Sequence, residues 1–217
     1  MEIIDKEMLH IHIKGIHDDI WQVGNELLVD ESFNSHLTNN FDIPSGVKDK
    51  NGDIVLLETI QKDIINKISS DEDILNLRNL SDDEILDKMY FLRNTLKETT
   101  YRLHQLGLRN REESLEEVRK EFYPNLPSRY HSLWVCDQDS YEHWRSILGK
   151  RETESFSLLL NGNLFKSSDT FLPTEGALKK EQREEAHRYW NPTFLTEEDE
   201  LKKEYLFQGK VKILKKL

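Results

Sequence analysis

The amino-acid sequence predicts an α+β fold, in which strand-rich stretches near both ends of the chain form a sheet and helices lie between them. Residues 9–13 (Leu-His-Ile-His-Ile) alternate strictly, as a half-buried strand does. Residues 53–107 instead carry apolar residues three or four positions apart, which is the spacing of an amphipathic helix. We therefore expect a single α+β domain over residues 1–217, with 53–107 as an inserted helical hairpin.

Extended chain and a loop follow the first strand. Residues 21–29 form a second extended stretch, within which Gly24 suits a bend or bulge. Residues 31–52 are rich in Asn, Asp, Ser and Gly, a composition typical of a long loop. The insertion is predicted to begin after this loop.

Two helices are predicted in the insertion, and a shorter one follows it. The first carries Ile54 to Ile68 at helical spacing. The second begins at Ser81-Asp82-Asp83-Glu84, a capping box in which Ser81 and Glu84 each bond the other's backbone N–H. The pattern predicts an end near Gly107 and a separate helix over residues 114–122, which ends before Pro124.

Short helices and strands are predicted in the C-terminal half. Asn161-Gly162-Asn163 is typical of a tight hairpin turn between two short strands, and Gly209 predicts a break in the last extended stretch. The other predicted elements are a loop leading into a buried strand (127–137), helices over 140–148 and 175–190, a strand over 156–160, a helical turn from 196 and extended chain over 204–214.

The charge of the chain disfavours several kinds of partner. Asp and Glu number 41 against 30 Lys and Arg, for a formal net charge of −11. Such a field repels phosphate backbones and anionic lipid, which disfavours non-specific nucleic-acid binding and membrane association. No stretch approaches the ~18 apolar residues that a spanning helix needs. We expect a small-molecule nucleotide or a protein as partner.

The first residues and the cysteine content indicate a cytoplasmic protein. Residues 1–7 lack the basic start and apolar run of a signal peptide. Cys136, the one cysteine, cannot form an internal disulfide, which suits a reducing compartment. It ends the stretch Leu-Trp-Val-Cys, which is typical of a buried strand, so a structural role is predicted for it.

Several motif-bearing enzyme classes are disfavoured by the absence of their motifs. The sequence contains neither GxxxxGK[ST] nor GxGxxG, which disfavours P-loop nucleotidases and Rossmann dehydrogenases. It also lacks GxSxG, HExxH and paired CxxC motifs, which mark α/β-hydrolases, zinc proteases and zinc sites.

Two histidines are the first candidates for a site. His10 and His12 lie two apart on the predicted strand, so their imidazoles share one face. Two such histidines can hold a metal, and His17 follows, but a metal site needs a third ligand. The alternative is a pair of half-buried histidines on a polar strand face. We assign no metal and keep a His-based metalloenzyme as an alternative.

A second group of candidates lies before the central strand. Residues 127–132 (Pro-Ser-Arg-Tyr-His-Ser) place hydroxyls and a cation at the entrance of that strand, where sites often form. The alternative is a turn in which Ser128 is a local cap. Glu204, which opens the last extended stretch, means nothing by itself.

Taken in order, these features resemble the ADP-ribosyltransferase superfamily. In that family a late Glu is followed by apolar residues, a loop with Gly and an alternating strand, and residues 204–213 (Glu-Tyr-Leu-Phe-Gln-Gly-Lys-Val-Lys-Ile) are similar. The His-bearing strand followed by residues 21–26 (Trp-Gln-Val-Gly-Asn-Glu) resembles the family's start. Residues 126–137, with Tyr141 and Trp144 after them, resemble a bacterial family of uncharacterised proteins that we associate with this fold.

The resemblance implies an ADP-ribosyltransferase-like split sheet whose cleft binds NAD as a substrate. Glu204 would be catalytic and stabilise the positive charge that builds on the ribose. His10 would hydrogen-bond the ribose or the nicotinamide amide, and Ser128 would support Glu204. The acceptor of ADP-ribose is unknown.

The same resemblance implies a set of NAD-binding residues. His12 shares the role of His10, and Ser132 shares that of Ser128. Arg129 would pair with the pyrophosphate, since its fork matches phosphate oxygens. Tyr130 is also assigned to NAD binding, and a Tyr or Trp would stack on the nicotinamide. The alternative is a non-catalytic binding protein on the same scaffold, with the acidic helical insertion as its partner surface.

Overall fold

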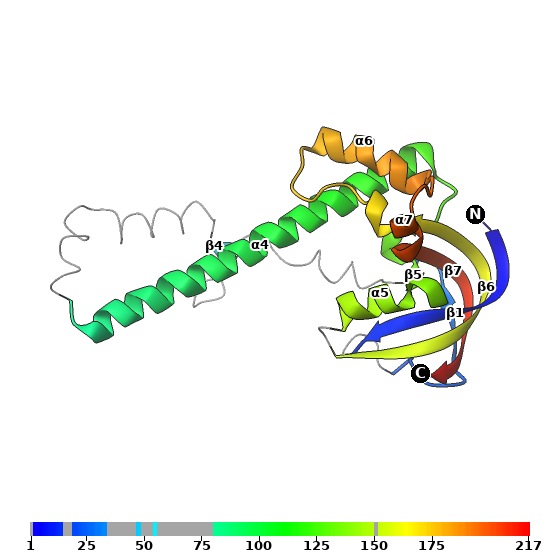
Figure 1. Ribbon diagram of the computed structural model, residues 1–217, viewed down its shortest axis with the longest axis horizontal. Helices are drawn as coiled ribbons and strands as arrows, with labels where there is room; N and C mark the ends of the chain where they lie inside the picture. Colours follow the sequence, from blue (N-terminus) through cyan, green and yellow to red (C-terminus); the bar gives the residue numbers. More distant parts are fainter. Residues whose placement is uncertain (1, 15–18, 34–46, 49–53, 56–79, 150–151) are drawn as a thin grey trace. The chain divides into compact units, whose positions relative to one another are not determined.

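The computed structural model describes residues 2–14, 19–33, 47–48, 54–55, 80–149 and 152–217 (Figure 1). The chain divides into two compact units, one of residues 41–108 and one of residues 1–40 with 109–217. The second unit contains helices and a five-stranded antiparallel sheet, so the predicted α+β class is confirmed. No helix of the described residues is long and apolar enough to cross a membrane.

The unit of residues 41–108 contains a small strand pair and part of a long helix. Strand β3 (Val47–Lys48) pairs antiparallel with β4 (Ile54–Val55). The prediction that a helix begins near Ile54 is therefore wrong at its start, because β-branched residues favour strands where a partner strand is present. The rest of that predicted helix lies outside the described residues.

Helix α4 (Asp82–Phe122) begins at the predicted capping box. The backbone N–H of Ser81 donates to Glu84 Oε2 at 2.9 Å, and that of Glu84 donates to Ser81 Oγ at 3.4 Å. The predicted end near Gly107 and the separate helix over 114–122 are wrong, because α4 is continuous. A single glycine costs a helix only about 1 kcal/mol relative to alanine, which the surrounding helix formers offset.

The sheet of the second unit is built on three long strands from the two ends and the middle of the chain. Its order is β1 (Glu2–Ile13), β6 (Thr153–Ser168), β7 (Lys203–Lys216) and β2 (Glu26–Val29), all antiparallel. The short strand β5 (Leu133–Val135) also pairs with β7. In Figure 1, β6 and β7 run side by side and curve strongly along their length.

Two glycines in the middle of this sheet correct two predictions. Gly162 makes no hairpin turn and Gly209 makes no break: they lie opposite each other in continuous strands, with φ of 159° and 146°. A Cβ added at Gly162 would lie 2.4 Å from the carbonyl oxygen of Gln208. The glycines thus permit the close approach of two curved strands. In the sequence, a glycine used in this way looks the same as a glycine in a turn.

Shorter helices follow along the second unit. They are η2 (Arg129–His131), α5 (Gln138–Leu148), η3 (Asp169–Phe171), α6 (Lys179–Trp190) and α7 (Glu197–Leu201). Asp137 caps α5 by accepting from the N–H of Ser140 at 3.1 Å. The C-terminal end of α4 packs with α6, where the Trp190 indole donates to the carbonyl of Leu115 at 2.8 Å.

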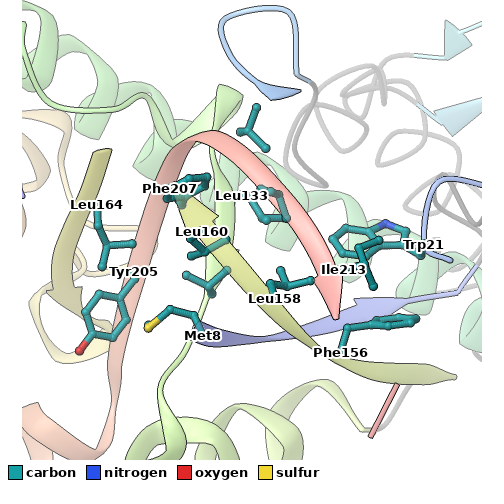
Figure 2. Close-up of a cluster of buried hydrophobic side chains, with 13 residues drawn as sticks. Met8, Trp21, Leu133, Phe156, Leu158, Leu160, Leu164, Tyr205, Phe207 and Ile213 are labelled. Carbon is teal, nitrogen blue, oxygen red and sulfur yellow. The ribbon is translucent and has the colours of Figure 1, made fainter. Parts of the chain in front are cut away.

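Apolar side chains cover both faces of the sheet. Figure 2 shows the cluster on one face, in which Met8 of β1, Phe156 of β6 and Phe207 of β7 converge, all at most 1% exposed. On the other face, Leu206 packs with Leu115 of α4 and with aromatic residues of α6. Alternate residues of β7 serve the two clusters, and Glu204, on the same face as Leu206, is buried although it is charged.

Candidate functional site

A cavity of about 140 Å³ lies between strands β1 and β5. The two strands meet at one bridge, where the N–H of Leu9 donates to the carbonyl of Cys136 and the reverse bond forms, each at 2.9 Å. Residues 9–13 and 132–136, which lead away from this bridge, line the cavity together. The site is therefore built where two neighbouring strands diverge.

Aromatic rings form much of the cavity wall. Trp21 stacks on His10 with ring centroids 4.3 Å apart and lies 5.2 Å from the ring of His12. Trp134 and Trp144 also line the cavity. His10 Nδ1 lies 2.8 Å from the carbonyl oxygen of Trp134, and since a carbonyl only accepts, this nitrogen carries the hydrogen.

Glu204, the second residue of β7, is one of the residues that line the cavity. It is 2% exposed, and its Oε1 accepts from the Arg129 guanidinium at 2.6 Å and from the Tyr189 hydroxyl. Its Oε2 is buried and has no hydrogen-bond partner within the described part of the chain. Burial raises the pKa of Glu204, against the lowering effect of Arg129 and Tyr189. One carboxylate oxygen is thus held and the other is unsatisfied.

Arg129 lies behind Glu204 and is almost fully buried. Its Nε donates to Glu112 Oε2 at 2.7 Å. Its guanidinium carbon lies 4.3 Å from the Trp134 ring centroid and 4.6 Å from that of Tyr189. Burial alone would lower the pKa of Arg129, but the charges around it, first that of Glu112, raise it above its ordinary value. Arg129 is therefore a permanent cation whose position is set by carboxylates and rings.

Ser132 supplies a second unsatisfied polar group. It is fully buried, and its hydroxyl has no hydrogen-bond partner among the described residues. Trp134 pairs with Leu206, which puts Cys136 beside Glu204. Ser132 lies four residues from Cys136 along the chain, a separation of roughly 13 Å in extended conformation. The two unsatisfied groups therefore lie toward opposite ends of an otherwise apolar cavity.

Backbone groups also face the space between β1 and β5. Leu9 and Cys136 direct both of their backbone groups at each other. In an antiparallel strand every second residue points its N–H and C=O the same way, so those of Ile11 and Trp134 are directed into this space. The His10 bond to the carbonyl of Trp134 agrees with this direction.

The structure brings together four of the seven residues proposed from the sequence. His10, His12, Ser132 and Glu204 line the cavity, and Arg129 contacts Glu204. The remaining two, Ser128 and Tyr130, do not line it. Ser128 Oγ accepts from the N–H of Tyr130 at 3.2 Å and caps η2, which is the local role weighed as the alternative.

Two residues that hold this site were not singled out from the sequence. Tyr189 lies in a predicted amphipathic helix, where an aromatic residue indicates core. Glu112 lies among many charged residues of α4 and is nonetheless 1% exposed. Both are recognisable only by their contacts with Arg129, between residues far apart in sequence.

Cys136 lines the cavity, but its thiol is bonded and protonated. The Cys136 thiol donates to the carbonyl of Leu9 at 3.7 Å, and burial raises its pKa to about 12, so it stays protonated. Among the residues that the structure describes, no group of three His, Cys, Asp or Glu side chains could hold a metal ion. His17 lies outside those residues.

Comparison with known families gives a match over most of the chain. A family described as "Protein of unknown function (DUF2441)" matches residues 9–217. No curated protein matches the chain. The match spans every residue that lines the cavity, so the site lies within the part of the chain that defines the family.

Proposed function

This chain belongs to DUF2441, a family of unknown function, and from its cavity we propose that it binds NAD as a substrate and cleaves the bond between nicotinamide and ribose. This is the chemistry of the ADP-ribosyltransferase superfamily, which the order of its His, Ser and Glu residues resembles. The acceptor of ADP-ribose is left open, with water as the simplest case.

The size and lining of the cavity support a single planar ring as its occupant. In another protein, a cavity of about 150 Å³ lined by apolar side chains binds benzene. A cavity of about 140 Å³ therefore accommodates the nicotinamide ring, while the rest of NAD would extend out of it. Trp21, Trp134 and Trp144 offer faces on which such a ring stacks.

The charge at the cavity supports a cationic ring in particular. The nicotinamide ring of NAD is positively charged, and both aromatic faces and a carboxylate attract a cation. Glu204 supplies that carboxylate from within a chain of net charge −11. The amide of nicotinamide carries one donor group and one acceptor, which the backbone groups of Ile11 could pair with.

The chemistry assigns a defined role to Glu204. The C–N bond to ribose C1′ breaks, and nicotinamide leaves with the electron pair as a neutral molecule. Positive charge develops on the ribose, where the carboxylate stabilises it. The acceptor's nucleophilic atom then bonds to C1′ and releases a proton. Glu204 Oε2 is the group that would face a ribose hydroxyl or this charge.

The unsatisfied Oε2 of Glu204 in an aromatic cavity carries the proposal, and a single substitution tests it. Glu204→Gln keeps the size of the side chain and removes its charge. We expect it to lower the rate of nicotinamide release from NAD by at least about 100-fold, a typical effect of removing transition-state charge stabilisation. Chromatography of released nicotinamide measures the rate.

Glu200→Gln is the matched control, because Glu200 lies in α7, four residues before Glu204, and forms exposed ion pairs. Its rate should equal that of the unsubstituted protein. Unchanged nicotinamide release in Glu204→Gln would refute the proposed role of Glu204. Binding of NAD without release of nicotinamide by the unsubstituted protein would instead support the non-catalytic binding protein.

A further inference from the structure

One oxygen of Glu204 is held by two donors from separate elements. Arg129 belongs to η2 and Tyr189 to α6, and both donate to Oε1. The Arg129 guanidinium also donates to the Tyr189 hydroxyl, so the three groups bond one another. Both donors bind Oε1 and neither binds Oε2, which has no hydrogen-bond partner in the described part of the chain. The two bonds therefore fix the rotation of the carboxylate about its last bond.

Glu112 balances the charge of this group. The carboxylate of Glu112 accepts hydrogen bonds from two nitrogens of Arg129, at 2.7 Å and 3.3 Å, and Glu112 is 1% exposed. The charge of Arg129 lowers the pKa of Glu112 against the effect of burial, so Glu112 is ionised. Arg129 and Glu112 thus form a neutral pair, and Arg111, which donates to Glu112 Oε1 at 3.1 Å, adjoins it.

From these contacts we propose that Arg129 and Tyr189 are positioning residues, which clamp Oε1 of Glu204 and direct Oε2 to the ligand, with Glu112 holding Arg129 in place. This inference rests on the proposed function and adds the residues that prepare the Glu204 carboxylate for its role in cleaving NAD. None of the three is among the residues that line the cavity. They act by lowering the pKa of Glu204 against the raising effect of burial, and by holding its carboxylate in one orientation.

Hydrogen bonds to the ionised form of a carboxyl lower its pKa, and removing one raises it. Tyr189→Phe removes the hydroxyl and keeps the ring that packs against Arg129. The pKa of Glu204 should therefore rise in Tyr189→Phe. In an enzyme that needs ionised Glu204, the acid limb of the pH–rate profile moves to higher pH by the same amount.

The test uses the full chain with ¹³C-labelled glutamate and no ligand. The Glu204 carboxyl resonance, assigned with Glu204→Gln, is titrated in the unsubstituted protein and in Tyr189→Phe. Tyr205→Phe is the control, because it removes a similar hydroxyl–carboxylate bond, at 2.9 Å to Asp137, from the other face of β7. We expect the midpoint to rise in Tyr189→Phe and to stay unchanged in Tyr205→Phe.

The pH–rate profile of nicotinamide release is measured on the same variants. In Tyr189→Phe we expect a drop of about tenfold below the shifted midpoint, with the lost rate recovered at higher pH. A purely structural role would lower the rate equally at all pH values. An unmoved Glu204 midpoint in Tyr189→Phe would overturn the clamp, whatever the protein does to NAD.

The two proposals fail in different ways. If the protein neither binds nor cleaves NAD but the midpoint moves as expected, the clamp stands and the proposed substrate falls. Should Tyr189→Phe not fold, the unsubstituted protein with ¹³C-labelled tyrosine still decides. The ring carbon that bears the Tyr189 hydroxyl must then titrate together with Glu204, and its failure to do so would overturn the clamp.

Discussion

At the scale of single residues, the buried charged groups in the described part of the chain have ion-pair or hydrogen-bond partners, and Arg129 is the clearest case. Arg129 and Glu112 are each 1% exposed and bond each other directly. Removing one partner of such a pair leaves the other charge buried without compensation, which costs far more than the pair itself contributes. The Glu112–Arg129 pair is therefore a weak source of stability but a strong constraint on where Arg129 lies.

Glu112→Ala should accordingly destabilise the protein by about 3–5 kcal/mol, because Arg129 stays buried without its main partner. Urea unfolding measures the free energy. Glu117→Ala is the control: Glu117, on the same helix, pairs with Lys179 and Arg183 at a side-chain exposure of 40%. Its loss should cost less than about 1 kcal/mol. Equal losses in the two variants would contradict this account of Arg129.

Sequence reasoning at this scale found side chains but not their partners. His10 and His12 could be assigned to one strand face, since the period of a strand is fixed. Ser128 and Ser132 lie four apart in one motif, and the sequence does not distinguish the cap from the cavity residue. The role of Tyr189 depends on a bond to Glu204, 15 residues away, which local patterns do not contain.

At the scale of elements, the sequence correctly predicted structure that depends on neighbouring residues, and it failed where the structure depends on a partner strand. The capping box at Ser81 was predicted correctly because its bonds are confined to one turn. The stretch Asn161-Gly162-Asn163 has the composition of a turn, yet it lies in the middle of β6. There the neighbouring strand β7 supplies the hydrogen-bond partners that a turn would have supplied.

The close approach of β6 and β7 predicts a clear asymmetry between glycines. Gly162→Ala places a Cβ 2.4 Å from the backbone oxygen of Gln208 at a positive φ, and it should cost about 2–4 kcal/mol. Gly176→Ala shares a positive φ of 79° but meets no atom within 4 Å, so backbone strain of about 1 kcal/mol remains. Urea unfolding of both variants measures the difference. Similar losses would show that strain, and not the approach of β7, explains Gly162.

At the scale of the whole molecule, the cavity joins the beginning, the middle and the end of the chain. Residues 9–13 come from β1, residues 132–136 from β5 and its flanks, and Glu204 from β7. The long pairings of β6 with both β1 and β7 hold these segments together. The sequence suggested the three segments, but the divergence of β1 from β5 after a single bridge depends on the curvature of the complete sheet.

A ligand that occupies this cavity should stabilise the whole second unit, because binding to the folded state alone adds RT ln(1 + [L]/Kd) to the free energy of unfolding. At 100 times its Kd, 1-methylnicotinamide, the cation methylated at the ring nitrogen, should add about 2.7 kcal/mol and raise Tm by several degrees. Nicotinate has a ring of the same size but carries a negative charge, and the Glu204 carboxylate should exclude it. Differential scanning calorimetry at matched concentrations compares the two ligands.

In Glu204→Gln the preference for the cation should shrink or disappear, since the wall of the cavity then keeps its aromatic rings but loses its charge. Equal stabilisation by nicotinate and by 1-methylnicotinamide in the unsubstituted protein would mean that apolar contact alone selects the ligand, and that the buried carboxylate serves the fold.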